Sequence, residues 1–480
     1  MASFLTTLFL AILSVYFAIA LFSYPRTKSP AGFFNVASKS QMRITTVFGN
    51  ITLGTGFAYL TTTGSTLGLG ALAGPLGVLV GFALLAKLEG VISLYKDNSG
   101  VAPRNYANFL SNTSHFTKIS FVFNLVRLLV FMCLIAFEIW LSSKYLSAIF
   151  GFGPDGALVY ASATILGCMA IGYSVIGGFP AALKTDYVQA FTVLLLILFL
   201  LFAGFSQPGL QQSQTSIATL LESTPATTLP WLLATLAVFA TAVATQFYNI
   251  INTSASRNRS SEENNSSFLV VGFLQATVIF LILIIGVVFS SNQGGQDLVA
   301  FFGQQASGTS MLDGVLAALI LIGLTSIIFT TVDSAIVSLA QLSGDLLGLD
   351  CDSAEDAIWP RLLSGLIGFF TIPFTIWLVY MNFPIMDVVF VILTPLGAMA
   401  AYLAASIFVA VKKRKQKSNL WADISCAFFV IAVSASQLAN LFELPEGYLG
   451  AYTLVSFVPA VLILAYGLFI KKTRGNTAAQ

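Results

Sequence analysis

The chain has 480 residues, of which 57% are hydrophobic and 9% are charged, and its formal net charge at pH 7 is +2. Roughly a quarter of the residues in an ordinary soluble domain are charged, so this composition excludes a water-soluble fold. A lipid bilayer is the expected surrounding, and no nucleic-acid partner is expected.

Apolar runs of about 20 residues, the length of a helix that crosses a bilayer, recur along the chain. The first run lacks the basic segment and cleavage site of a signal peptide, so we interpret it as a retained helix. We predict about thirteen transmembrane helices, at residues 3–23, 45–63, 67–88, 119–142, 156–176, 184–206, 230–253, 267–291, 311–344, 360–381, 386–411, 420–441 and 448–470. No soluble domain remains between them. The prediction is an all-α integral membrane protein with one transmembrane domain over residues 1–480.

Lysine and arginine gather on one side of this predicted topology. The loops on the side of the C-terminal tail hold Arg26, Lys184 and the basic run 412–417, whereas the loops on the other side hold only Lys144. Positively charged loops normally stay in the cytoplasm. We therefore expect an outside N-terminus and a cytoplasmic C-terminus in a plasma membrane, such as a bacterial inner membrane.

Two of the predicted helices are irregular. Residues 45–63 contain Gly49, Gly54 and Gly56 among several threonines, and both residue types lower helix propensity. Residues 230–253 become polar in their second half. Broken helices at corresponding positions of two halves indicate an inverted-repeat transporter, because their free carbonyls must line a cavity. These two lie five helices apart, which predicts a repeat of five plus five.

The helix predicted at 311–344 carries the most informative polar stretch. Ile327, Thr330, Thr331 and Ser334 follow the i, i+3, i+4 spacing and share one face. Hydroxyl oxygens beside the free carbonyls of a broken helix suit a hard cation such as sodium. The alternative is that these hydroxyls bond to carbonyls of their own helix or hold neighbouring helices together.

Ionisable residues inside the membrane are a second signal. Asp333 lies within helix 311–344, where a charge costs roughly 2.5–3.5 kcal/mol and normally faces the protein interior or a water-filled path. Asp186, at the start of helix 184–206, is its expected partner, although a carboxylate there also suits an N-cap. Arg127 and Glu138 need interior partners as well, and they lie too far apart along one helix to pair with each other.

Four motifs, in the expected order, resemble the sodium/solute symporter family, which includes the sodium/glucose, sodium/proline and sodium/sialic acid symporters. Residues 177–189 resemble its GG-x-x-A-x-x-x-T-D-x-x-Q signature, and residues 329–334 resemble its M-S-T-x-D-S motif. Residues 102–110 are similar to the inner-loop A-P-R…F-L segment, and residues 48–57 to the broken first core helix.

This resemblance implies a LeuT-like core of ten helices over residues 45–411. An extra helix and inner loop at 1–44 precede it, and two helices and a tail at 412–480 follow it. The family's sodium ligands, carried to this sequence, are the carbonyls of Gly49, Thr52 and Ile327 and the hydroxyls of Thr330 and Thr331. Gly49 and Thr52 are placed to within one residue, because the glycine pattern aligns in two ways. A second cation or coupling site, as in some members, uses Asp186, Asp333 and Ser334.

The motifs leave the solute open. The chain between Thr331 and Asp345 is one residue shorter than the family pattern, and residues 244–249 lack the aromatic and arginine pattern of many members. By position we predict a substrate pocket lined by Thr55, Gln246, Tyr248 and Asn249. The alternative is that these side chains only pack helices together.

The predicted function is a sodium-coupled symporter that imports a small polar organic solute by alternating access. The solute classes considered are sugars, amino acids, organic acids and sialic acids, and Na+ is the predicted cofactor. Two alternatives stay open: a solute-sensing membrane module without transport, and a proton-coupled symporter that uses Asp333 and Asp186. An enzyme is not expected, because the scattered four cysteines and single histidine form no metal-binding or catalytic pattern.

Overall fold

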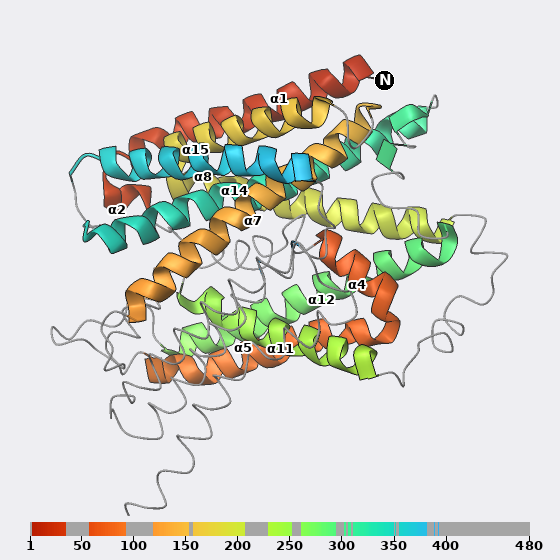
Figure 1. Ribbon diagram of the computed structural model, residues 1–480, viewed down its shortest axis with the longest axis horizontal. Coiled ribbons are helices and arrows are strands. Elements are labelled where there is room, and N and C mark those ends of the chain that lie inside the picture. The colour runs from red at the N-terminus through yellow and green to blue at the C-terminus, as the bar shows by residue number, and fades with distance from the viewer. Residues whose placement is uncertain are drawn as a thin grey trace, which may run out of the picture. The chain divides into compact units, whose positions relative to one another are not determined.

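The computed structural model describes residues 2–34, 57–92, 119–152, 157–206, 229–251, 261–293, 302–303, 306–308, 311–349, 351, 355–381, 388 and 392. All regular elements in these residues are helices (Figure 1). They are α1 (Ala2–Ser23), α2 (Pro30–Phe33), α4 (Tyr59–Leu67), α5 (Ala73–Ile92), α7 (Ile119–Ile149), α8 (Ala157–Ser206), α11 (Leu229–Ile251), α12 (Ser261–Gln293), α14 (Met311–Leu347) and α15 (Ile358–Met381), with the 3-10 turns η1 (Tyr24–Arg26) and η3 (Gly68–Leu72).

Seven apolar stretches within the described residues are long enough to cross a bilayer, with α8 counted once. The expectation of a helical membrane protein is thereby confirmed. The predicted helices at 386–411, 420–441 and 448–470 lie outside the described residues, apart from 388 and 392, so the number thirteen stays a prediction. The predicted break in 45–63 also stays a prediction, because only residues 57–63 of that helix are described.

Among the predicted helix ends, that of α7 departs furthest from the structure. The prediction ends at residue 142, whereas α7 continues to Ile149. Ser142 and Ser143 donate hydrogen bonds of 2.5 and 2.6 Å to carbonyls four residues earlier in the helix. A serine hydroxyl that bonds back to its own helix is compatible with a continuing helix, so these polar residues do not end it.

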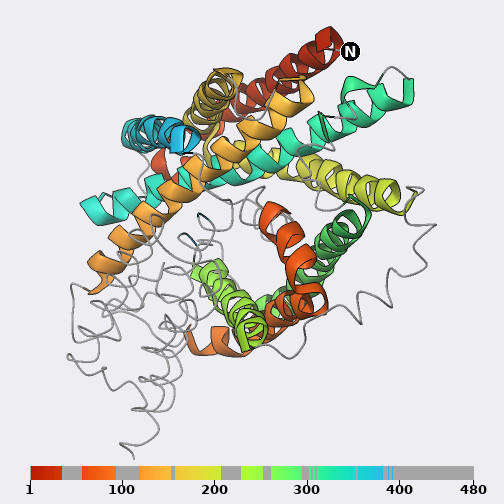
Figure 2. The same ribbon diagram turned by 45° about the vertical axis from the view of Figure 1, so that its right-hand side comes forward.

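The chain forms two compact units. The first comprises residues 1–71, 131–224 and 277–389, and the second comprises residues 72–130, 225–276 and 390–480. In the first unit, α8 packs against α1, α14 and α15, and α14 also contacts α1 and α15 (Figures 1 and 2). In the second unit, α5 packs along α11.

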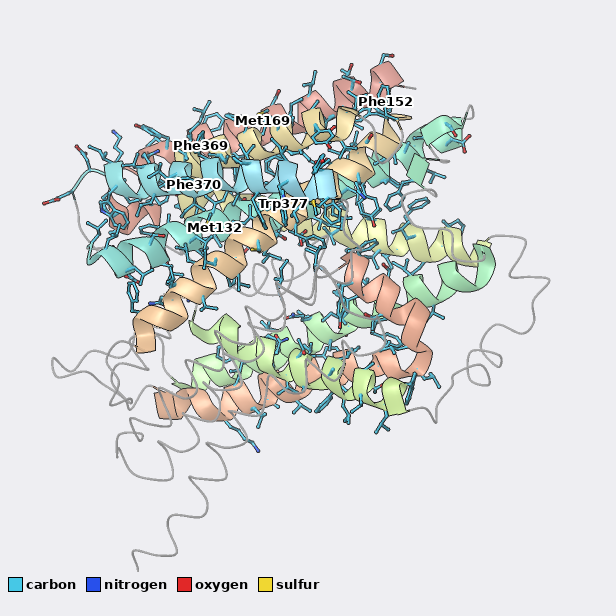
Figure 3. All side chains as sticks on the ribbon, viewed as in Figure 1. Met132, Phe152, Met169, Phe369, Phe370 and Trp377 are labelled. Atoms are coloured by element: carbon cyan, nitrogen blue, oxygen red, sulfur yellow. The ribbon has the colours of Figure 1, made fainter. Side chains whose placement is uncertain are left out.

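Large apolar side chains lie on the outer faces of the helices, and three carboxyl groups lie inside. Phe369 and Phe370 project from α15 with 65% and 59% of their surface exposed (Figure 3). Asp186, Asp333 and Glu138 have no exposed surface. A surface of large exposed aromatic side chains around buried carboxylates suits lipid as the surrounding medium, since charged groups in membrane helices face the interior.

Three glycines on one face of α5 allow it to pack closely on α11. A Cβ atom at Gly77 would lie 2.6 Å from the carbonyl oxygen of Phe239, and one at Gly81 would lie 2.8 Å from the carbonyl oxygen of Val243. Gly74 faces Val238 on the same side. Small residues at such spacing let two membrane helices approach at backbone distance, where van der Waals packing holds them together.

Gly286 of α12 makes a similar close contact with α4, which gives a first prediction. An added Cβ there would clash with the backbone of Thr61, whereas one at Gly365 of α15 meets nothing nearer than 3.8 Å. Overpacking of this kind costs about 1–3 kcal/mol. We expect Gly286→Ala to lower the apparent melting temperature of the purified protein in detergent, and Gly365→Ala to leave it unchanged. Equal melting temperatures for the two variants would contradict the α4–α12 contact.

Candidate functional site

The site begins at a sharp elbow in α8. Gly178 has φ 53° and ψ −159°, a backbone conformation that favours glycine, and it divides α8 into two halves. The halves correspond to the predicted helices 156–176 and 184–206. Pro180 follows two residues later. Because proline has no backbone N–H, it leaves the carbonyl of Ile176, four residues before it, without its helical donor.

Arg361 of α15 supplies the missing donors at this elbow. Its Nη1 donates to the carbonyls of Val175 and Ile176, at 2.8 and 3.1 Å. Its Nη2 donates to the carbonyl and hydroxyl oxygens of Thr27, at 2.8 and 2.9 Å. A cation at the C-terminal end of a helix also suits the helix dipole. One guanidinium therefore caps the first half of α8 and ties it to the chain that follows α1.

The two glycines of the elbow let the N-terminal segment pack directly on it. A Cβ atom at Gly178 would lie 2.8 Å from the carbonyl oxygen of Phe33, and one at Gly177 would lie 3.2 Å from the Cα of Ala20. Lys184, at the start of the second half, donates to the hydroxyl of Ser23 at 2.9 Å. The elbow thus has a fixed environment of α1 and α2, and it sets the direction of the half-helix that carries Asp186.

Asp186 on α8 and Asp333 on α14 are two buried carboxyl groups on helices that pack against each other. Both carboxyl groups have no exposed surface, and they interact electrostatically with each other. Asp333 Oδ1 accepts a hydrogen bond from the backbone N–H of Ser334. Asp333 Oδ2 and the Ser334 hydroxyl have no hydrogen-bond partner of normal geometry among the described residues. Buried polar atoms are nearly always satisfied in native proteins, so a ligand or water is expected beside them.

The two threonines of the predicted sodium site are buried on α14. Thr330 is 1% exposed and donates to the carbonyl of Ser326 at 2.7 Å. Thr331 is 4% exposed and donates to the carbonyl of Ile327 at 3.3 Å. Both hydroxyls therefore bond to carbonyls of their own helix, which was the alternative to a role as cation ligands. This bonding uses each hydroxyl's hydrogen and leaves its oxygen lone pairs available.

Other predicted site residues are described less fully. Gly49, Thr52 and Thr55 lie outside the described residues, and Tyr248 and Asn249 are described only as backbone of α11. Gln246 is 3% exposed, and its amide donates to the carbonyl of Ala242 at 3.0 Å. Its side chain lies against Gly81 of α5. For Gln246, this geometry favours the helix-packing alternative.

Several polar residues that the sequence analysis gave no role also gather here. Gln189 is fully buried on α8, and neither atom of its amide has a hydrogen bond of normal geometry within the described part of the chain. Thr192 Oγ1 donates to Ser326 Oγ at 2.7 Å. The hydroxyls of Tyr173 and Thr185 lie 3.0 Å apart. Gln189 lies in the family signature at residues 177–189, whereas Ser326 directly precedes Ile327, the first residue of the predicted polar face of α14.

Comparison with known proteins identifies the fold. No protein-family model and no curated protein matches the sequence. A solved structure of a Na+-coupled sialic acid symporter, in a substrate-bound outward-open state, matches with a TM-score of 0.71 and 13% identity over 96% of this chain and 98% of that one. A nucleobase-cation-symport-1 family transporter, closed with bromovinylhydantoin bound, matches with a TM-score of 0.53 and 12% identity over 92% and 95%.

The chain has the fold of a membrane transporter. Proteins that share this fold can carry different solutes, and the residues of the site decide which one. Both neighbours are transporters rather than enzymes, in agreement with the expectation from the sequence. The fold of the sialic acid symporter agrees with the expectation of a symporter-type transporter.

Proposed function

We propose that this chain is a sodium-coupled secondary active symporter that imports a small polar organic solute by alternating access. The observation that carries the proposal is the pair Thr330 and Thr331, which lie buried in a transporter fold on α14, the helix that also carries the buried carboxyl group of Asp333. We further propose a plasma-membrane location with the N-terminus outside.

The first sodium site uses Thr330, Thr331 and the carbonyl of Ile327, with the carbonyls of Gly49 and Thr52 from the helix that is predicted to be broken. A hydroxyl that donates its hydrogen to a helix carbonyl turns its lone pairs outward, where they can coordinate a cation. Back-bonding and sodium coordination are therefore compatible. The bond from Thr331 to Ile327 is long at 3.3 Å, so a sodium ion at that carbonyl displaces only a weak interaction.

The second cation or coupling site uses Asp186, Asp333 and Ser334. Two buried carboxylates at close range repel each other, and a cation or a proton between them removes the repulsion. This pair also supports the proton-coupled alternative. Sodium coupling and proton coupling differ in their driving force. Sodium coupling requires Na+ at every pH, whereas proton coupling gives uptake in potassium buffer under a pH gradient alone.

Coupling requires that sodium bind one conformation more tightly than the other. In our proposal, sodium at the first site favours the outward-open arrangement, and solute binding then permits closure and inward release. The proposed solute is a sugar, amino acid, organic acid or sialic acid. Thr55, Tyr248 and Asn249 remain the proposed lining of its pocket, and Gln246 is its least supported member.

A thermal-unfolding screen of the purified protein tests this proposal. Members of the four solute classes are added in sodium chloride and in potassium chloride of equal ionic strength. A bound ligand stabilises the folded state, so the true solute is expected to raise the melting temperature in sodium and much less in potassium. Equal stabilisation in both salts would count against sodium coupling. A solute that binds but is not taken up by proteoliposomes would favour the sensing module.

A further inference from the structure

We propose that Gln189 of α8 is a further ligand of the second cation site, where its amide oxygen coordinates sodium beside Asp186 and Asp333. The inference rests on the proposed function and adds to it. It gives a role to a buried residue that lies outside the predicted set of site residues.

Two contacts fix the register in which the second half of α8 packs on α14. Thr192 Oγ1 donates to Ser326 Oγ at 2.7 Å. One turn further along α8, the Cβ of Leu196 lies 2.8 Å from where a Cβ atom at Gly323 would be. The residue numbers rise along α8 while they fall along α14, so the two helices run antiparallel at this contact.

The same register places Gln189 between the predicted first and second cation sites. Gln189 lies one helical turn before Thr192, and one turn of α14 in the matching direction leads to Thr330. A further turn along both helices brings Asp186 opposite Asp333. Gln189 therefore lies on the face of α8 that packs on α14, about one turn from the level of the two carboxyl groups.

The amide of Gln189 is buried without a partner of normal geometry. Gln189 has no exposed surface, and neither Oε1 nor Nε2 makes a hydrogen bond within the described residues. Asp333 Oδ2 and the hydroxyl of Ser334 lack a partner in the same way. Burial of such groups is costly unless something satisfies them, so several unpaired oxygen atoms in one region indicate a bound ligand.

The chemistry of an amide suits a sodium ligand beside two carboxylates. Its oxygen is a neutral, hard ligand, and hard cations prefer oxygen. Its N–H groups can donate to a carboxylate oxygen, so both ends of the amide are satisfied when sodium is bound. An amide adds no negative charge to the pair and is not a titratable group, so it favours sodium over a proton. A packing role alone would be served by leucine, which buries no polar atom.

Gln189→Leu, which fills the space without an oxygen, tests the inference directly. The readout is the sodium concentration for half-maximal thermal stabilisation without solute, with choline chloride added to keep the ionic strength constant. We expect this concentration to rise about tenfold or more, the effect of losing one ligand as strong as a hydrogen bond to a charged group. Without sodium, the melting temperature should equal or exceed that of the wild type, because a buried unpaired amide has been removed. Gln189→Met, which keeps the length of the side chain, should behave in the same way.

The matched control is Gln275→Leu on α12. Gln275 is also buried, and its Oε1 also lacks a partner among the described residues. We expect its half-maximal sodium concentration to equal that of the wild type. If Gln189 only packs helices together, Gln189→Leu will lower the melting temperature without sodium and leave the half-maximal sodium concentration unchanged, which would overturn the inference.

A double-mutant cycle with Asp333→Asn tests whether Gln189 serves the second cation site. If both residues hold the same ion, Gln189→Leu has little further effect on the half-maximal sodium concentration in the Asp333→Asn background. An undiminished effect in that background would overturn the inference. A wild type without any sodium response refutes the proposed function as well, whereas a sodium-responsive wild type with an unaltered Gln189→Leu refutes only the role of Gln189.

Discussion

Thr331→Val is expected to abolish most of the sodium response of this protein. Valine keeps the shape of threonine and removes the hydroxyl, so the proposed sodium ion loses a direct ligand. If a hydroxyl ligand to the ion contributes about as much as a hydrogen bond to a charged group, about 1.5–3 kcal/mol, its loss corresponds to a rise of about tenfold or more in the sodium concentration for half-maximal uptake. Thr330→Val is expected to act in the same direction, and Thr331→Ser to retain most of the response.

The matched control is Thr371→Val on α15. Thr371 is fully buried and donates to the carbonyl of Gly368 at 2.7 Å, so it reproduces the back-bonded geometry away from the proposed site. If the hydroxyls of Thr330 and Thr331 serve only their own helix, all three valine variants will respond to sodium alike. That result would contradict a ligand role for the pair.

Loss of Arg361 is expected to have the largest effect on stability. Arg361→Ala removes four hydrogen bonds at the elbow of α8 and leaves the carbonyls of Val175 and Ile176 without these donors. It also removes a guanidinium that lies 4.5 Å from the ring centroid of Tyr24. The carbonyl of Ile176 keeps a hydrogen bond from Thr27 Oγ1 at 3.2 Å. An acceptor left unsatisfied, such as the carbonyl of Val175, costs about 1–3 kcal/mol, so we expect a clearly lower melting temperature in detergent.

Two comparison variants sharpen this test. Arg361→Lys keeps the charge but cannot reach several acceptors at once, so an intermediate melting temperature is expected. Lys28→Ala removes an exposed cation near the same end of α1 and is expected to match the wild type. An Arg361→Ala protein that unfolds at the temperature of Lys28→Ala would show that the elbow does not depend on the guanidinium.

The sequence predicts those parts of the site where a polar residue lies within an otherwise apolar helix. Asp333 and the threonine pair were predicted from such positions, and the structure places them in the interior. The hydroxyl spacing alone could not decide between a cation ligand and a back-bond, because both use the same helix face. The structure shows the back-bonds, which are compatible with either role.

Other contacts depend on tertiary packing that one sequence does not reveal. The role of Arg361 at the elbow could not be predicted, since nothing local in the sequence links it to Val175, 186 residues earlier. Tyr16 lies in an apolar helix, where a tyrosine is more commonly an interface anchor, yet its ring stacks on Phe329 of α14 with centroids 4.7 Å apart. Gly178 was part of a recognised motif, but its elbow depends on how Pro180 and Phe33 pack around it.

Uptake of the identified solute into proteoliposomes under imposed ion gradients tests the central claim most directly. We predict accumulation of the solute when an inward sodium gradient is present, none when potassium replaces sodium, and none under a pH gradient alone. The Thr331→Val protein should show little accumulation under the same sodium gradient. Equal uptake in potassium, or accumulation driven by the pH gradient without sodium, would contradict sodium coupling through Thr330 and Thr331.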